Sequence, residues 1–308
     1  MLDLEKIRLS TNLDLFAKQV VEGFITGKHR SPYHGFSVEF SEHRLYNLGE
    51  NPKHIDWKLF ARSDKLFVKR YQEETNLRCQ LILDVSSSMY YPSFKNLSFK
   101  NPNKLFFSTY AAAVLINLLK KQRDAVGLTL FSEKIDLHIP PKSTLRHQKL
   151  IYHNLEKCLN IDSIKNVKKT NSISSVHEIS EMLHRRSLVM IFTDLINNES
   201  DVDKQFESFK HLKYNKHEVI LFYLSEPLTE INFDFNDTAC NFIDVETGEK
   251  IKLNPNQYKE EYQKKSKKYL SLLKLKCLQY KIDLVEVDIN KGFDQILLAF
   301  LLKRQKMF

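Results

Sequence analysis

Two aspartates and a set of hydroxyl side chains in this chain have the types and spacing to bind a metal ion. Asp84, Ser86 and Ser88 lie in "LILDVSSSM", where an apolar run ends in an acid followed by serines. The D-x-S-x-S spacing brings one carboxylate and two hydroxyls toward a common point, and hard oxygen donors of this kind suit magnesium. Because one loop cannot complete an octahedron, other loops must supply further oxygen ligands.

Two other loops offer such oxygens. The run "LVMIF" leads directly into Thr193 and Asp194, and the hydroxyl-rich "KKTNSISS" contains Thr170 and Ser172. Three loops of this composition supply few charges, so waters or a partner's carboxylate would complete the shell and the ion would remain strongly electrophilic. A site of this kind suits adhesion to an acidic side chain. Ser87, between the two serine ligands, is predicted to point away from the ion.

Helix capping is the alternative for these residues. Ser and Asp after a strand often cap the next helix, and an isolated D-x-S-x-S match does not separate the two roles. The order of strands favours the metal, because loops at the carboxyl ends of parallel strands meet in one crevice. The motif does not fit two enzyme templates: it lacks the second aspartate of D-x-D phosphotransferases, and no serine lies in G-x-S-x-G.

The elements that would position these loops alternate from Leu77 onward. Apolar runs predict strands at 79–84, 125–131, 188–193, 218–224 and 282–287. Helical patterns lie at about 104–121, 144–159, 173–186, 200–213, 256–279 and 292–304. This alternation is typical of an α/β fold with a mostly parallel central sheet and helices on both faces. A hairpin is predicted at 241–253.

The first 76 residues differ from the rest. A helix is predicted from Leu13 to Gly27, followed by short alternating segments such as "FSVEF" and "LFVKRY" among prolines and glycines, which favour strands and turns. We therefore predict two domains, 1–76 and 77–308. Around Trp57 the chain concentrates charge, and Glu39 or Asp56 could act as a base with His43 as a shuttle. Structural ion pairs are the favoured interpretation, because the spacing matches no catalytic template.

Composition narrows the function classes. A chain of 308 residues with 42% hydrophobic content can bury a sizeable core. Its four distant cysteines form no C-x-x-C pair, which argues against disulfide frameworks and cysteine zinc sites. The net charge of +9 comes mostly from lysines along helices, which indicates solvated faces rather than a nucleic-acid site. The apolar stretch from Leu105 is interrupted by polar residues and is predicted to be a core helix. The N-terminus carries acids and polar residues where a secretory signal would have a basic start and an apolar run, so the protein is predicted to be cytoplasmic.

Five motifs in order resemble one family, the von Willebrand factor type A-like proteins of the bacterial domain-of-unknown-function family number fifty-eight. They are the segment from His29 to Glu74, "LILDVSSSM", "DAVGLTLF", "HRRSLVMIFTDL", and "FIDVETGEK" followed by a lysine-rich helix. The resemblance implies a Rossmann-like von Willebrand factor A-type domain with a metal-ion-dependent adhesion site, preceded by a small strand-rich region. It matches Asp84, Ser86 and Ser88 to the first adhesion-site loop and Asp194 to the third. Thr170 is the choice for the second loop, with Ser172 as the alternative.

The resemblance also implies a cofactor and a partner. The ion would be Mg²⁺, or Mn²⁺ in its place, and the partner a MoxR-type AAA+ ATPase or an acidic client protein in chaperone-like assembly of protein complexes. No nucleotide loop of the form G-x-x-x-x-G-K-[ST] occurs in the chain. The predicted function is a non-enzymatic interaction module. The alternative, a phosphatase-like hydrolase using the same ion, lacks an obvious general base in these loops.

Overall fold

The chain forms two compact units, Met1–Gly27 with Leu77–Phe308 and Lys28–Asn76. A computed structural model describes residues 12–27, 40–47, 55–63, 65–71, 77–92, 97–159, 172–195, 202–235, 240–243 and 249–307. The division differs from the predicted one in the first helix, α1 (Leu13–Gly27), which belongs to the larger unit. The reason is its buried apolar face, which includes Phe16 and Val20 and packs into the core of that unit.

The smaller unit contains a strand pair and a short helix. β1 (Phe40–Leu45) pairs antiparallel with β2 (Phe67–Tyr71), as the alternating segments predicted in outline. The helix α2 (Trp57–Ser63) was not predicted. It is capped by Asp56, whose Oδ1 accepts hydrogen bonds from the backbone N–H groups of Lys58 (3.0 Å) and Leu59 (3.2 Å). Glu39 and the side chain of His43 lie outside the described residues, so the acid–base alternative for this region stays untested.

The larger unit is built on a six-stranded sheet with the order β10-β7-β6-β3-β4-β5. Every neighbouring pair is parallel except β4 and β5. This confirms the predicted α/β class with a mostly parallel sheet. The strands are β3 (Arg78–Asp84), β4 (Ala125–Phe131), β5 (Ile135–Lys142), β6 (Leu188–Thr193), β7 (Glu218–Ser225) and β10 (Asp283–Asp288).

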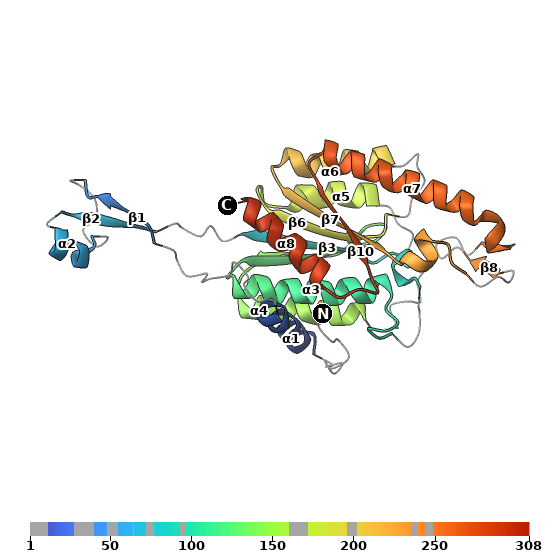
Figure 1. The fold of residues 1–308 in the computed structure, drawn as a ribbon, viewed down its shortest axis with the longest axis horizontal. Helices are drawn as coiled ribbons and strands as arrows, with labels where there is room; N and C mark the ends of the chain where they lie inside the picture. The colour runs from blue at the N-terminus through green and yellow to red at the C-terminus, as the bar shows by residue number, and fades with distance from the viewer. Residues whose placement is uncertain are drawn as a thin grey trace. The chain divides into compact units, whose positions relative to one another are not determined.

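Helices cover both faces of this sheet (Figure 1). One face carries α1, α3, α4 and α8, and the other carries α5, α6 and α7. Side chains alternate between the two cores along each central strand, since Leu81 and Leu83 of β3 face the first core and Ile82 the second. The helices are α3 (Lys104–Lys121), α4 (Leu145–Cys158), α5 (Ser172–Met182), α6 (Val202–Tyr214), α7 (Pro255–Gln279) and α8 (Asp294–Met307).

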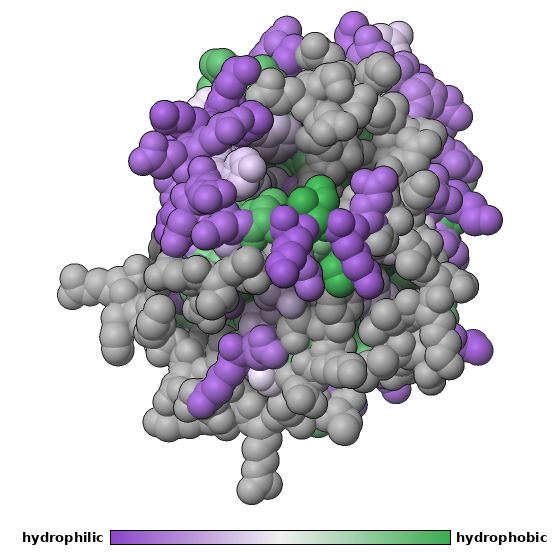
Figure 2. Space-filling model, turned by 90° about the vertical axis from the view of Figure 1, so that its right-hand side faces the viewer, coloured by the Kyte–Doolittle hydropathy of each residue, from purple (hydrophilic) through white to green (hydrophobic). Residues whose placement is uncertain are grey.

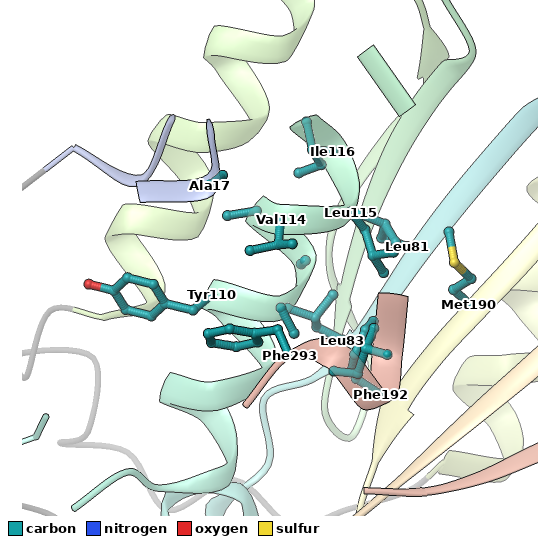
Figure 3. Close-up of a cluster of buried hydrophobic side chains, with 14 of the residues drawn as sticks. Ala17, Leu81, Leu83, Tyr110, Val114, Leu115, Ile116, Met190, Phe192 and Phe293 are labelled. Atoms are coloured by element: carbon teal, nitrogen blue, oxygen red, sulfur yellow. The ribbon is translucent and has the colours of Figure 1, made fainter. Parts of the chain in front are cut away.

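The α3 helix is the centre of the first core, as the sequence predicted. Figure 3 shows its residues Val114, Leu115 and Ile116 in the cluster of buried side chains that also contains Leu81 and Leu83 of β3 and Phe192 of β6. The described helices include none whose length and apolar character would let it cross a bilayer. The predicted hairpin is also present, as the antiparallel strands β8 (Cys240–Ile243) and β9 (Lys250–Leu253).

The sheet reverses its order at β3. From β3 the chain crosses to β4 on one side, whereas β6 pairs with β3 on the other side. Loops that leave the carboxyl ends of β3 and β6 therefore diverge and leave a crevice between them. Asp84 is the last residue of β3, and Asp194 directly follows β6. The fold thus brings two of the predicted ligands to the point where an open parallel sheet offers a binding site.

Candidate metal centre

The first loop holds its polar groups close together in a buried position. The Oδ1 atom of Asp84 accepts a hydrogen bond from the backbone N–H of Ser86 at 2.9 Å, and the Oγ atoms of Ser86 and Ser88 lie 3.1 Å apart. All three residues are buried. A 3-10 turn, η2 (Ser87–Tyr90), starts after Ser86, but the Ser86 hydroxyl makes no capping hydrogen bond to it, and α3 is capped by Asn103 instead. The serines therefore do not serve as the helix caps that the alternative interpretation required.

The third loop meets the first as predicted. The Ser88 hydroxyl donates to Oδ1 of Asp194 at 3.2 Å. Thr193, the last residue of β6, donates its hydroxyl hydrogen to Oδ2 of Asp84 at 2.9 Å. The structure thus places Asp84, Ser86, Ser88 and Asp194 in one hydrogen-bonded cluster, with Thr193 fixing the orientation of the Asp84 carboxylate.

The structure describes only the part of the second loop region that belongs to α5. Thr170 lies outside the described residues, and so does the side chain of Ser172, the first residue of α5. The start of α5 is nonetheless placed, because the Ser175 hydroxyl donates to the carbonyl oxygen of Ser132 at 3.5 Å. Ser132 follows β4, whose Phe131 is paired with Asp84. The α5 helix therefore begins at the same edge of the sheet, and the choice between Thr170 and Ser172 stays a prediction.

Ser87 lies on a different side of the loop from the clustered hydroxyls of Ser86 and Ser88. It lines a cavity of about 300 Å³ together with Tyr90, Asp136 and Asn154, beside β5 and α4. This position agrees with the prediction that Ser87 points away from the clustered oxygens. Ser87 is therefore a suitable control position for substitutions at its two neighbours.

Sequence reasoning missed two charged residues of the site, Lys104 and Glu230. The Nζ atom of Lys104 lies 3.0 Å from Oδ2 of Asp194 and also pairs with the Glu230 carboxylate. Glu230 belongs to a one-turn π-helix, η5 (Pro227–Ile231), that follows β7. One signal could have revealed Lys104: it opens a mostly apolar helix, where an ammonium needs a buried acidic partner.

Burial and neighbouring charges shift the protonation of this cluster. Burial, together with the charge of Asp194, raises the pKa of Asp84 to about 7, although hydrogen bonds from Ser86 and Thr193 favour the ionised form. Burial alone would lower the pKa of Lys104, but the carboxylates of Asp194 and Glu230 raise it above its ordinary value. The Lys104 ammonium therefore balances Asp194, whereas Asp84 has no cation of its own among the contacts that the structure describes.

The donor set fits a hard divalent cation. Neighbouring oxygens in a magnesium octahedron lie about 3 Å apart, because each Mg–O distance is about 2.1 Å. The separations between the Oγ atoms of Ser86 and Ser88 (3.1 Å) and between Ser88 Oγ and Asp194 Oδ1 (3.2 Å) match that spacing. No group of three or more His, Cys, Asp or Glu side chains in the described ranges is arranged to hold a metal. A metal at this position would thus depend on the serine hydroxyls.

The raised pKa of Asp84 gives a testable dependence of stability on pH. The unfolded chain loses this proton near the ordinary pKa of 3.8, whereas the folded protein keeps it until about pH 7. Without metal, the free energy of unfolding should thus fall between about pH 4 and pH 7, by up to about 4 kcal/mol from this group. Urea unfolding in chelator across this range, compared between the wild type and Asp84→Asn, measures the effect. Equal pH slopes in the two proteins would contradict it.

Comparison with known structures gives matches of low identity. A conserved hypothetical protein BatB from Bacteroides thetaiotaomicron is 17% identical, with a TM-score of 0.45 over 75% of this chain and 100% of that one. An aerotolerance-related membrane protein from Bacteroides fragilis is 17% identical, with a TM-score of 0.43 over 72% and 98%. The SpRpn10 VWA domain is 11% identical, with a TM-score of 0.37 over 71% and 94%.

Sequence comparison identifies relatives and a family. Uncharacterized proteins of Mycobacterium tuberculosis (Rv1480) and Mycobacterium bovis (Mb1516) are 31% identical over 77 residues. That match covers 25% of this chain and about a quarter, 24%, of each relative. The model of the family described as "Protein of unknown function DUF58" matches residues 42–269, about three quarters of the chain. The chain therefore belongs to the DUF58 family.

Proposed function

We propose that this protein is a non-enzymatic interaction module that grips an acidic side chain of a partner through a magnesium-dependent adhesion site. The observation that carries the proposal is the meeting of Asp84, Ser86, Ser88 and Asp194 at the carboxyl edge of the sheet. Thr170, or Ser172, is the proposed ligand from the second loop. Mg²⁺ is the proposed ion, and Mn²⁺ could replace it because it accepts the same oxygen donors.

The charge of the ligand set favours binding to a carboxylate. Asp84 and Asp194 are the acidic ligands, and Asp194 already shares its charge with Lys104. An ion held by so few unshared negative charges remains electron-poor and attracts a further anionic oxygen at an open position. A partner's Asp or Glu supplies such an oxygen.

The same geometry disfavours hydrolysis. A metal-activated water needs a nearby base to take its proton. The carboxylates nearest to the cluster in the described part of the chain are already engaged, Asp84 and Asp194 as proposed ligands and Glu230 with Lys104. Turnover of a generic phosphate ester that disappears in Asp194→Asn would overturn this preference.

The face around the site has the mixed character of a protein interface. Figure 2 views the edge at which the parallel strands end and shows apolar residues near its middle, bordered by hydrophilic ones. Leu228 of η5, two residues from Glu230, has 57% of its surface exposed. Together with the resemblance to MoxR-associated proteins, this supports a MoxR-type AAA+ ATPase or its acidic client as the partner. The cytoplasmic location predicted from the sequence is part of the same proposal.

Replacing Asp84 tests the proposed function. We expect Asp84→Ala to weaken Mg²⁺ binding by at least about 100-fold, since even residues outside the direct ligand set cost 10–100-fold. Isothermal titration of the purified chain with MgCl₂ measures this. Capture of a purified MoxR-type ATPase should require Mg²⁺, stop in chelator and stop in the variant.

Ser87→Ala is the matched control, because Ser87 lies in the same loop but lines the neighbouring cavity. It should bind Mg²⁺ and the ATPase like the wild type. Equal Mg²⁺ affinity and equal capture by wild type and Asp84→Ala would rule out the proposed adhesion site.

A further inference from the structure

The ammonium group of Lys104 occupies an unusual position for a lysine. Its side chain is fully buried, although Lys104 is the first residue of α3, where the helix dipole disfavours a positive charge. Burying an ammonium is costly unless acidic groups pair with it. Two carboxylates do so, Asp194 at 3.0 Å and Glu230. The sheet edge thus already contains one cation, and this cation is part of the chain.

Asp194 faces two groups at once. Its Oδ1 atom accepts from the Ser88 hydroxyl, on the side of the proposed metal ligands, and its Oδ2 atom contacts the Lys104 ammonium. A divalent ion bound beside Oδ1 would lie within several ångströms of this ammonium, and like charges that close repel strongly in a buried site. Occupancy by the ion and tight pairing of Lys104 with Asp194 therefore oppose each other.

Glu230 offers the ammonium a second partner, and its own position is fixed by η5. The Oε2 atom of Glu230 accepts from the backbone N–H of Glu226 at 2.8 Å. The neighbouring Thr229 is hydrogen-bonded to the Tyr91 hydroxyl at 2.5 Å, which ties η5 to the segment that follows the first metal loop. The Glu230 side chain keeps 19% of its surface exposed, whereas Lys104 is fully covered. Glu230 is therefore the member of the trio that solvent or a partner can reach.

We propose that Lys104 is a built-in cation that competes with the divalent ion for Asp194, and that Glu230 sets the strength of this competition by holding the same ammonium. The inference rests on the proposed function, because it concerns the metal affinity of that site. A partner that contacts Glu230 would change how firmly Lys104 pairs with Asp194. The ion affinity and partner binding would then be linked through η5.

Two substitutions should change Mg²⁺ affinity in opposite directions. Lys104→Met removes the competing charge at similar side-chain length and should raise the affinity by about 10-fold or more. Glu230→Gln leaves the ammonium with Asp194 alone and should lower the affinity several-fold. Lys104→Arg, which keeps the charge, is the control and should not raise it. Titration of the full purified chain with MgCl₂, repeated with Mn²⁺ by electron paramagnetic resonance, measures all three.

The double variant Lys104→Met/Glu230→Gln tests whether Glu230 affects Mg²⁺ affinity through Lys104 or directly through its own negative charge. If Glu230 acts through Lys104, its substitution should change the affinity less than about twofold once Lys104 is gone. An equally large effect in both backgrounds would overturn the role of Glu230. Equal Mg²⁺ affinity of Lys104→Met and the wild type, with Asp84→Ala still deficient, would overturn the competition and leave the adhesion site standing.

Other outcomes are equally decisive. Absence of Mg²⁺ binding in both the wild type and Lys104→Met would reject the proposed adhesion site itself. Circular dichroism and urea unfolding check that Lys104→Met folds. If it does not fold, Glu230→Gln decides alone, because an unchanged Mg²⁺ affinity in that variant contradicts the inference.

Discussion

Asp194→Asn is expected to destabilise the metal-free protein by about 3 kcal/mol, whereas Asp84→Asn is expected to stabilise it near pH 8. The two carboxylates belong to one site, but their surroundings differ. Asp194 is paired with the buried ammonium of Lys104, so its loss leaves that charge with Glu230 alone. Burial and the nearby Asp194 raise the pKa of Asp84, so its ionised form is unfavourable in the folded protein and an amide relieves the cost.

Urea unfolding of both variants in chelator at pH 8 measures the two changes. Ser87→Ala serves as the control for a substitution in the same loop, and Lys104→Met in the Asp194→Asn background should recover part of the lost free energy. If both aspartate substitutions changed the free energy of unfolding in the same direction, the electrostatic account of the site would be contradicted. If the proposed adhesion site exists, both variants should bind Mg²⁺ poorly although their stabilities change in opposite directions.

Arg304→Leu is expected to lower the free energy of unfolding by about 3–5 kcal/mol. Arg304 of α8 pairs with Asp124, which precedes β4, and its Nη1 also donates to Oε1 of Gln122 at 2.7 Å. The other carboxylate oxygen of Asp124 accepts from the backbone N–H of Leu77 at 3.0 Å. Removing the guanidinium leaves a buried carboxylate without its cation at the junction of α8 with the starts of β3 and β4.

Urea unfolding at pH 7 measures this loss. Lys274→Ala is a control, because Lys274 pairs with Glu286 at 2.7 Å but both side chains are about half exposed. Exposed ion pairs contribute little to the free energy of unfolding, so the urea midpoint of Lys274→Ala should be close to that of the wild type. Adding Asp124→Asn to Arg304→Leu should recover much of the stability, since it removes the stranded charge. An Arg304→Leu variant as stable as Lys274→Ala would show that the buried pair contributes nothing.

Much of the fold follows from local patterns in the sequence. The predicted strands at 79–84, 125–131 and 188–193 agree with β3, β4 and β6 to within one residue. Such runs are recognisable because side-chain periodicity is a property of neighbouring residues. The β5 strand escaped prediction because Pro140 and Pro141 lie in it, and a sheet tolerates them only at an edge, a position that the local sequence does not specify.

The assignment of α1 shows a second limit of local patterns. Its apolar face was recognisable, but the surface that covers this face lies mainly on α3, far along the chain. The aromatic ring of Phe16 packs edge-on against that of Tyr110 of α3 at 4.8 Å between centroids. An amphipathic pattern predicts that a helix has a partner without identifying it. The choice of partner belongs to the tertiary structure.

The candidate site likewise combines residues that the sequence predicts with a pair of residues that only the fold brings together. The local sequence predicted the first loop, because Asp84, Ser86 and Ser88 lie within five residues, and the rule that parallel strands end at one edge predicted Asp194 beside it. Only the tertiary structure brought Lys104 to Glu230, which is 126 residues away in the chain. No spacing rule encodes that pair, because an ion pair depends on where two side chains end in space. The residues proposed as ligands were therefore predictable from the sequence, whereas the pairing of Lys104 with Glu230 was not.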